Sequence, residues 1–126
     1  MSEEFSFTGR VRSVGFALEG IATMLASQHN AWLHAAATVM VVSAGAALRI
    51  DRTEWCFLVL AMVAVWTAEA LNTAFEFLAD VASPGFHPVV KRSKDVAAGA
   101  VLITACGAVV IGAIVFGPHI FHFARP

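Results

Sequence analysis

Three long runs of apolar residues occupy most of the chain, and short polar stretches separate them. Each run has the roughly 17–25 residues that a membrane-spanning helix needs. None of them alternates between apolar and polar positions as a strand of a membrane barrel does. The last run is followed by Gly117 and Pro118, a pair typical of a helix end. The pattern predicts spanning helices at about residues 31–49, 54–79 and 95–117.

A different pattern precedes the first run. From about Phe5 to residue 27, apolar side chains recur at steps of three and four and so share one helical face. These side chains are Phe7, Val11, Val14, Leu18, Ile21 and Leu25. Arg10, Arg12 and Glu19 fall on the rest of the helix. We expect an amphipathic helix in the membrane interface, and a helix packed only against protein is the alternative.

The composition supports an all-α membrane protein built as a single domain. The chain has 126 residues, of which 59% are hydrophobic and 13% charged. A soluble domain usually has about 45–50% apolar and about 25% charged residues. This chain has too few polar residues to cover its own core, so lipid must be part of its solvent. Its formal net charge of −1 argues against nucleic-acid binding, which depends on clustered positive charge.

Lysine and arginine residues in the short flanks predict the orientation of the spans, because cytoplasmic flanks are enriched in them. One side carries Arg10, Arg12, Lys91, Arg92 and Lys94, and the other carries Arg49, Arg52 and Arg125. We therefore expect the N-terminus and the loop at residues 81–95 on the cytoplasmic side of a cell (inner) membrane.

The second predicted span carries a polar face formed by Glu69, Asn72, Glu76 and Asp80. At about 100° per residue, all four lie within about 80° of one another around the helix. An ionisable residue inside a membrane costs at least a few kcal/mol, so such residues normally face the protein interior and have a function. Here they occupy only the cytoplasmic half of the span, which favours an interfacial enzyme over a transport pathway. A purely structural role for the carboxyl groups is the alternative.

The loop after this span supplies positive charge. Lys91, Arg92 and Lys94 follow the carboxylates, and Lys94 and Asp95 stand at the predicted start of the third span. A helix N-terminus with nearby lysines favours phosphate binding, and adjacent carboxylates hold Mg²⁺ together with substrate phosphates. The combination predicts magnesium–nucleotide chemistry at the lipid boundary. For the basic loop taken alone, a topology signal with lipid headgroup contact is the favoured alternative. The sequence has no P-loop motif.

Three segments carry a family resemblance: EALNTAFE at residues 69–76, DVASPGFH at 80–87 and KDVAAGAV at 94–101. With these segments, the chain resembles the prokaryotic diacylglycerol kinase family, which also includes undecaprenol kinases, from about Gly9 to Phe116. The resemblance implies a homotrimer of three-span subunits, each with a surface helix, whose active sites are shared between neighbours. It also implies ATP as phosphoryl donor, Mg²⁺ as cofactor and a membrane lipid alcohol as acceptor.

The same resemblance implies a role for each matching residue. Glu69 would be the general base that takes the proton of the lipid hydroxyl, Asn72 would support that geometry, and Glu76 would bind the metal. The residues that would position ATP are Asp80, Gly85, Phe86, His87, Lys94 and Asp95. Arg10, in the surface helix, would contact the nucleotide or the lipid.

Two positions depart from the family pattern. Many relatives have a glutamate before the first span that shares the metal with the carboxylate at Glu76, whereas this chain has Gln28, which offers a carbonyl oxygen but no charge. Where some relatives place an aromatic hydroxyl near the nucleotide, this chain has Phe16, so that hydrogen bond is absent. Neither change removes the predicted base.

The leading hypothesis is an ATP- and Mg²⁺-dependent kinase that converts diacylglycerol to phosphatidic acid. Undecaprenol is the alternative acceptor, because apolar packing between helices sets the fit and the sequence does not separate the two. A non-catalytic membrane protein, either a lipid-binding scaffold or an ion pathway, is the alternative from a different class.

Overall fold

The computed structural model describes residues 6–123, with side chains to residue 121, and these residues form four helices. The helices are α1 (Phe7–Ser27), α2 (His29–Leu48), α3 (Arg52–Ala82) and α4 (Pro88–Phe123). Phe5 and Arg125, which entered the predictions of the surface helix and of the orientation, lie outside the described residues. The predicted all-α architecture is confirmed.

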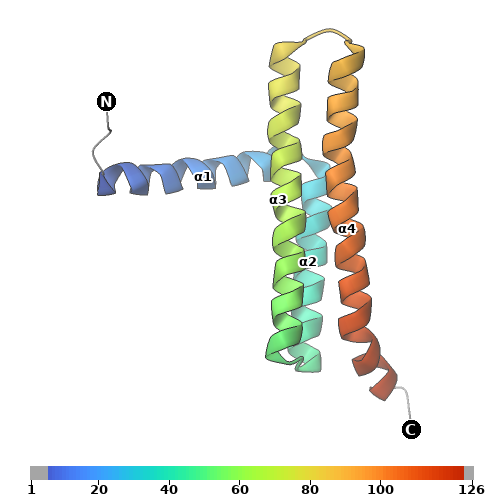
Figure 1. Ribbon diagram of the computed structural model, residues 1–126. Coiled ribbons are helices and arrows are strands. Elements are labelled where there is room, and N and C mark those ends of the chain that lie inside the picture. Colours follow the sequence, from blue (N-terminus) through green and yellow to red (C-terminus); the bar gives the residue numbers. More distant parts are fainter. Residues whose placement is uncertain (1–5, 124–126) are drawn as a thin grey trace.

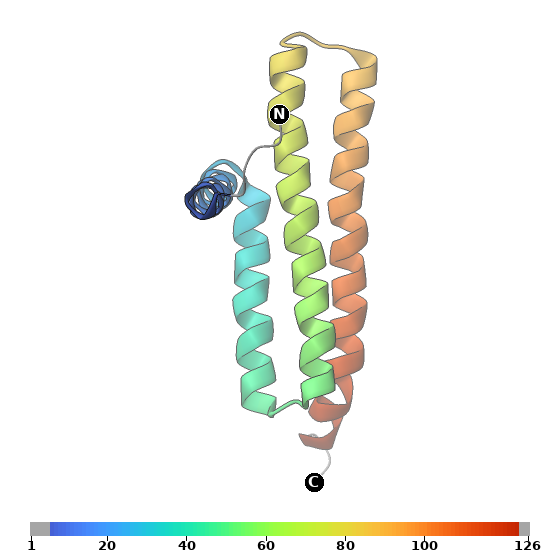
Figure 2. The ribbon, with the colours of Figure 1, turned by 60° about the vertical axis from the view of Figure 1, so that its left-hand side comes forward.

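The three long helices α2, α3 and α4 run side by side, and α1 projects sideways from them (Figure 1; Figure 2). At 1.5 Å per residue, the 20 residues of α2 span about 30 Å, which matches the hydrocarbon core of a bilayer. The 31 residues of α3 and the 36 of α4 span about 46 and 54 Å. Near their connecting loop, α3 and α4 continue past the level of α1 (Figure 1).

All three predicted spans are confirmed as helices long and apolar enough to cross a membrane. The bounds of α4 differ from the prediction at both ends. It begins at Pro88, where proline fits the first helical turn because its missing N–H needs no partner there. It also continues through Pro118 to Phe123 instead of stopping at Gly117 and Pro118. Pro118 lies within the last two turns, so it disturbs few of the helix's hydrogen bonds.

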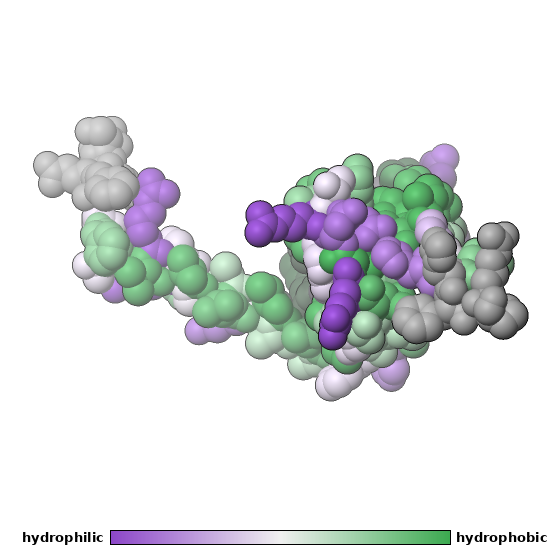
Figure 3. All heavy atoms as spheres, turned by 90° about the horizontal axis from the view of Figure 1, so that it is seen from below, coloured by the Kyte–Doolittle hydropathy of each residue, from purple (hydrophilic) through white to green (hydrophobic). Residues whose placement is uncertain are grey.

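Most of α1 lies clear of the other helices. Its apolar side chains are exposed along most of its length, for example Phe7 at 76% and Leu18 at 61%. Seen from the end of the bundle opposite the α3–α4 loop, apolar side chains run along α1 (Figure 3). In the same view, polar side chains gather at the end of the bundle.

The turn between α2 and α3 is tightly built. Arg49 ends α2 in the left-handed conformation, with φ 52°, and the N–H of Ile50 donates to the carbonyl of Gly45 at 3.2 Å. Asp51 then starts α3 with a capping box, in which its side chain accepts from the backbone of Glu54 and the Glu54 carboxylate accepts from the Asp51 N–H. The small core of Ile50, Leu58 and Val115 packs beside this turn.

A hydrogen-bonded histidine–glutamate contact joins α3 and α4 at the same end of the bundle. His119 Nε2 lies 3.0 Å from Glu54 Oε1 and 3.1 Å from Oε2. The pair holds the start of α3 against the last part of α4. The charged residues Asp80 and Lys94 of the predicted site lie at the other end of these two helices.

Candidate active site

Glu69 is the deepest ionisable residue of the predicted site. Its side chain on α3 is fully buried, and Glu69 Oε2 lies 3.6 Å from His34 Nε2 on α2. The Thr73 hydroxyl donates to the Glu69 carbonyl at 2.9 Å. Among the described residues, neither carboxylate oxygen of Glu69 has a hydrogen-bond partner. A buried carboxyl without partners is costly, and such a group is free to bind a substrate hydroxyl.

Asn72 and Glu76 continue the same face of α3 towards the loop. Asn72 Nδ2 donates to Glu76 Oε1 at 3.3 Å, and Gln28 Nε2 donates to Glu76 Oε2 at 2.9 Å. Gln28 is the cap residue between α1 and α2, so the second bond joins three helices at one carboxylate. The structure thus brings together the predicted metal ligand Glu76, its proposed partner Gln28 and the predicted supporting residue Asn72.

The residues at this point fit a magnesium ion that is shared with a nucleotide. No group of three or more His, Cys, Asp or Glu residues in the described chain is placed to hold a metal by itself. Mg²⁺ does not require one, because it commonly uses one or two carboxylates, substrate phosphates and water. Glu76 supplies the carboxylate, and Asn72 Oδ1 is buried without a hydrogen-bond partner. Gln28 would add an oxygen ligand once its amide turned to present Oε1.

A charged group follows at the loop end of α3 and α4. Lys94 Nζ donates to Asp80 Oδ1 at 2.9 Å, and Lys91 Nζ donates to Asp95 Oδ2 at 2.6 Å. The Asp80 and Asp95 side chains and that of Lys91 are largely exposed, so the group is open to a water-soluble ligand. The predicted ATP residues Asp80, Lys94 and Asp95 therefore lie at one end of the bundle.

The connecting loop holds the remaining residues predicted to position ATP. His87 Nδ1 accepts a hydrogen bond from the backbone N–H of Val89 at 3.3 Å, so His87 caps the start of α4. The Gly85 carbonyl accepts from the Ser83 hydroxyl at 3.0 Å. Phe86 is 83% exposed. The sequence had predicted Lys94 and Asp95 at the N-terminus of this helix. That prediction is wrong, because α4 begins at Pro88 and the two residues lie in its second turn.

The polar residues of α3 form a series from buried to exposed. At 1.5 Å per residue, Glu76 lies about 10 Å along the helix from Glu69, and Asp80 about 16 Å. Glu69 is fully buried, Glu76 is partly buried and Asp80 is exposed. The series places a carboxyl group inside the bundle, a candidate metal site above it and a charged group at the surface.

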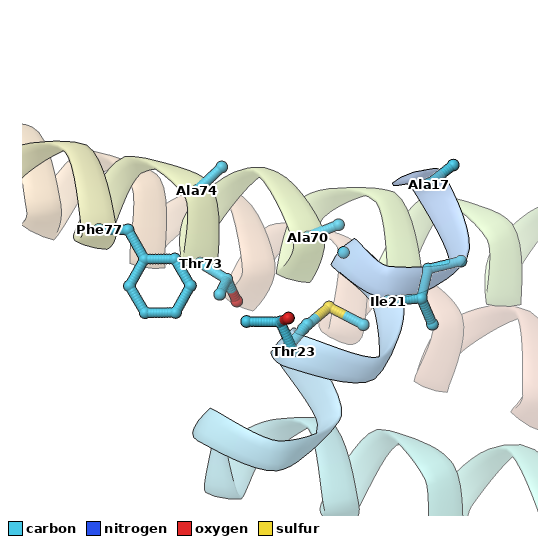
Figure 4. A pocket seen from close by; sticks show the side chains of 9 residues that line it. Ala17, Ile21, Thr23, Ala70, Thr73, Ala74 and Phe77 are labelled. Atoms are coloured by element: carbon cyan, nitrogen blue, oxygen red, sulfur yellow. The ribbon is translucent and has the colours of Figure 1, made fainter. Parts of the chain in front are cut away.

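A pocket with a cavity volume of about 370 Å³ lies between α1 and α3 beside this series. Its lining is mostly apolar and comes from both helices: Ala17, Gly20, Ile21, Thr23, Met24, Ala70, Thr73, Ala74 and Phe77. Phe77 and Ile21 stand at opposite ends of it (Figure 4). Ala70 and Thr73 are close neighbours of Glu69 on α3, so an apolar chain in this pocket would lie next to the buried carboxyl group.

The sequence profile of the prokaryotic diacylglycerol kinase family matches residues 15–116, which is most of the chain and includes every polar residue of the series on α3. The chain belongs to this family. The predicted family resemblance is thereby confirmed, and so is the expectation of an enzyme, a lipid kinase. The alternative of a non-catalytic scaffold or ion pathway finds no support in this membership.

Individual members of the diacylglycerol kinase family align over most of the chain. An undecaprenol kinase of Bacillus subtilis is 34% identical over 101 residues, which cover 80% of this chain and 82% of that protein. A diacylglycerol kinase of Synechocystis is 34% identical over 107 residues, which cover 84% of this chain and 61% of that protein. The diacylglycerol kinase of Escherichia coli is 25% identical over 113 residues, or 90% of this chain and 93% of that protein.

Two residues to which the diacylglycerol kinase resemblance gave a place at the nucleotide lie apart from the charged group in this chain. Arg10 and Phe16 are exposed residues of α1. Figure 1 shows that α1 leaves the bundle well below the α3–α4 loop, where Asp80 and Lys94 lie. A single subunit therefore does not bring Arg10 or Phe16 to the predicted ATP residues.

His34 is the residue of this site to which the sequence analysis gave no role. It is the one ionisable side chain in α2 after the first turn. This isolated position in an apolar span was a signal for a buried interaction. The partner of His34 could not be read from the sequence, because it depends on how α2 and α3 are rotated against each other.

Proposed function

We propose that this lipid kinase transfers the γ-phosphoryl group of ATP to the hydroxyl of diacylglycerol, giving phosphatidic acid and ADP. The observation that carries the proposal is the ordered series on α3, from the buried Glu69 through Glu76 to the exposed Asp80. Such an order suits a reaction between a donor dissolved in water and an acceptor dissolved in the membrane. Undecaprenol is the second candidate acceptor, because a relative of 34% identity bears the name undecaprenol kinase.

In the proposed reaction, Glu69 acts as the general base. Its carboxylate accepts the proton of the lipid hydroxyl while the hydroxyl oxygen forms a bond to the γ-phosphorus of ATP. The bond between that phosphorus and the β–γ bridging oxygen breaks, and ADP leaves with the electron pair. Among the described residues, the buried Glu69 carboxylate has no hydrogen-bond partner, so it is available to the hydroxyl. Asn72 contributes by holding Glu76 in place.

The nucleotide would be held above the base by the charged end of α3 and α4. Lys94 would exchange part of its interaction with Asp80 for the phosphates of ATP, and Asp95 and the loop of Gly85, Phe86 and His87 would border the nucleotide. Glu76 and Gln28 would hold Mg²⁺, which when bound neutralises charge that develops on the transferred phosphoryl group. Phosphoryl transfer depends mostly on such positioning and charge stabilisation. These few polar residues, with Mg²⁺ and Glu69, would therefore suffice for the reaction.

The apolar tail of the acceptor would lie in the pocket between α1 and α3. The pocket opens at the side of the bundle, where lipid would surround the chain, and reaches Ala70 and Thr73 beside the base. Its volume of about 370 Å³ accommodates part of one acyl or polyprenyl chain, while the rest would remain in the bilayer. Such a pocket selects for the region near the hydroxyl more than for the full length of the lipid.

We further propose that α1 lies in the cytoplasmic interface of a cell inner membrane. The exposed apolar side chains along α1 and its position at the level where α2 begins support this placement. The excess of lysine and arginine on the side of α1 and the α3–α4 loop supports a cytoplasmic orientation. The charged group would then face ATP in the cytoplasm.

A homotrimer would complete the site. Arg10 and Phe16 lie away from the ATP residues of their own subunit, so a neighbouring subunit is the surface that they would reach. The exposed apolar side chains of α3 and α4 would offer part of the contact between subunits. Native mass spectrometry of the protein in detergent, with a trimer as the expected mass, tests this assembly.

The acceptor is tested by offering diacylglycerol and undecaprenol together in mixed micelles with labelled Mg·ATP. Separation of the labelled products gives the ratio of the two kcat/KM values in one reaction. We expect label mainly in phosphatidic acid. Label mainly in undecaprenyl phosphate would identify the second candidate, and label in neither lipid would contradict the lipid kinase.

A further inference from the structure

A second polar group, the partly buried His34, faces the base inside the bundle. His34 Nε2 lies 3.6 Å from Glu69 Oε2, a separation at which the two groups face each other without a close hydrogen bond. His34 Nε2 and both oxygens of Glu69 are buried and have no hydrogen-bond partner among the described residues. Two unsatisfied groups of complementary chemistry that face each other at this distance need a shift of only a few tenths of an ångström to bond.

Contacts with α3 hold His34 in this position. The ring of Trp66 packs edge-on against the His34 ring, with centroids 6.3 Å apart and an angle of 68° between the planes. Trp66 Nε1 donates to the Thr38 hydroxyl at 3.1 Å, and that hydroxyl donates to the His34 carbonyl at 2.8 Å. The histidine is therefore fixed both at its ring and at its backbone by residues that lie about one helical turn from the contact with Glu69, towards the α2–α3 turn.

We propose that His34 is the positioning residue of the base. In the working enzyme, its imidazole donates the Nε2 proton to Glu69 Oε2 in a hydrogen bond and leaves Oε1 for the lipid hydroxyl. The bond fixes the direction of the carboxylate while Asn72 and Gln28 fix Glu76 above it. His34 touches neither the acceptor nor ATP in this scheme and acts only through Glu69. The inference rests on the proposed role of Glu69 as general base.

Two substitutions separate positioning from packing. His34→Gln keeps an N–H donor of similar reach, whereas His34→Leu keeps a similar volume without a donor. We expect His34→Leu to lower kcat about 10–100-fold, the scale of a misplaced catalytic group, with the KM values for Mg·ATP and lipid nearly unchanged. His34→Gln should stay within about threefold of the unaltered enzyme, because the donor is retained. Thermal unfolding of each purified variant establishes that it is folded.

The chain offers a matched control in its second histidine–glutamate pair. His119 contacts Glu54, which precedes Glu69 by 15 residues on α3 and so lies about 22 Å away along the helix. His119→Leu should lower thermal stability and leave kcat unchanged. Equal losses of kcat in His34→Leu and His34→Gln would overturn the positioning role. So would a change in the KM for Mg·ATP or lipid with kcat unaltered. The proposed function would still stand if the unaltered enzyme transfers phosphate and Glu69→Gln does not.

Discussion

The side-chain amide of Gln28 donates a hydrogen bond to Glu76 Oε2 at 2.9 Å. Gln28 is the residue that directly precedes α2, and Glu76 lies on the polar face of α3. The hydrogen bond therefore connects the start of α2 to the carboxylate that we propose as the metal ligand. A neutral amide leaves Glu76 as the single charged ligand that these residues supply, which makes the magnesium requirement of the enzyme sensitive to residue 28.

Gln28→Glu should lower the magnesium requirement. A second carboxylate beside Glu76 adds a charged oxygen ligand, so the Mg²⁺ concentration for half-maximal activity should fall about tenfold, or by about 1.4 kcal/mol of binding. A titration of activity with Mg²⁺ at saturating ATP measures it. Gln28→Met, which has similar size and no oxygen, should shift the titration the other way. An unchanged titration in both variants would show that residue 28 does not contact the metal.

Lys94→Met should weaken the binding of ATP. Removal of the ammonium group deletes a charge at the water-facing end of the series, so the KM for ATP should rise at least about tenfold. The KM for the lipid should change little, because Glu69 is about 16 Å away along α3 from Asp80, the partner of Lys94. Lys94→Arg should recover part of the loss. Arg52→Met, a loss of charge at the other end of α3, is the control and should leave the KM for ATP unchanged.

Gly45→Ala should destabilise the turn between α2 and α3. A Cβ atom at residue 45 would lie 2.9 Å from Trp55 Cη2 and 3.0 Å from Ile50 Cδ1, closer than such contacts normally are. Overpacking of this kind costs about 1–3 kcal/mol, so the thermal midpoint in detergent should fall. Gly117→Ala, where a Cβ would meet no atom within 4 Å, is the matched control. Equal thermal midpoints for the two variants would contradict this expectation, because they would show that the turn accommodates a Cβ atom at residue 45.

Cysteine labelling should place the α3–α4 loop in the cytoplasm. The native cysteines Cys56 and Cys106 are exposed, so they are first replaced by alanine. Single cysteines at the exposed positions Ala82 and Thr53 then report opposite ends of α3. In cells whose outer membrane is permeabilised and whose inner membrane is intact, a maleimide that cannot cross the inner membrane should label Thr53→Cys at once. It should label Ala82→Cys only after lysis. The reverse pattern would invert the proposed orientation and move the charged group away from cytoplasmic ATP.

Hydrophobic patterning alone was enough to predict the architecture of the chain. The three spans and the helix before them follow from the length and period of the apolar runs, and α2, α3 and α4 cover all three. The bounds of α4 were less predictable, because proline has two opposite effects on a helix. Pro118 was predicted to end the helix, but it lies so near the end of α4 that the helix passes through it, whereas Pro88 occupies the first turn of α4.

The site was predictable only within each helix. A rotation of about 100° per residue placed Glu69, Asn72 and Glu76 on one face of α3, and the structure buries Glu69 and Asn72 as that face requires. The contact of Glu69 with His34 was not predictable, because it depends on the relative rotation and height of two helices. The same limit applies to Arg10 and Phe16, whose proposed neighbours belong to another subunit.

The central claim is that Glu69 is the base of a lipid kinase, and Glu69→Gln tests it most directly. The measurement is kcat for transfer of labelled phosphate from saturating Mg·ATP to diacylglycerol or undecaprenol in mixed micelles. Glu54→Gln, at the far end of α3, serves as the control. We predict a loss of about 10²–10⁴-fold for Glu69→Gln with the protein still folded, and no loss for Glu54→Gln. A folded Glu69→Gln variant with the kcat of the unaltered enzyme would contradict the account.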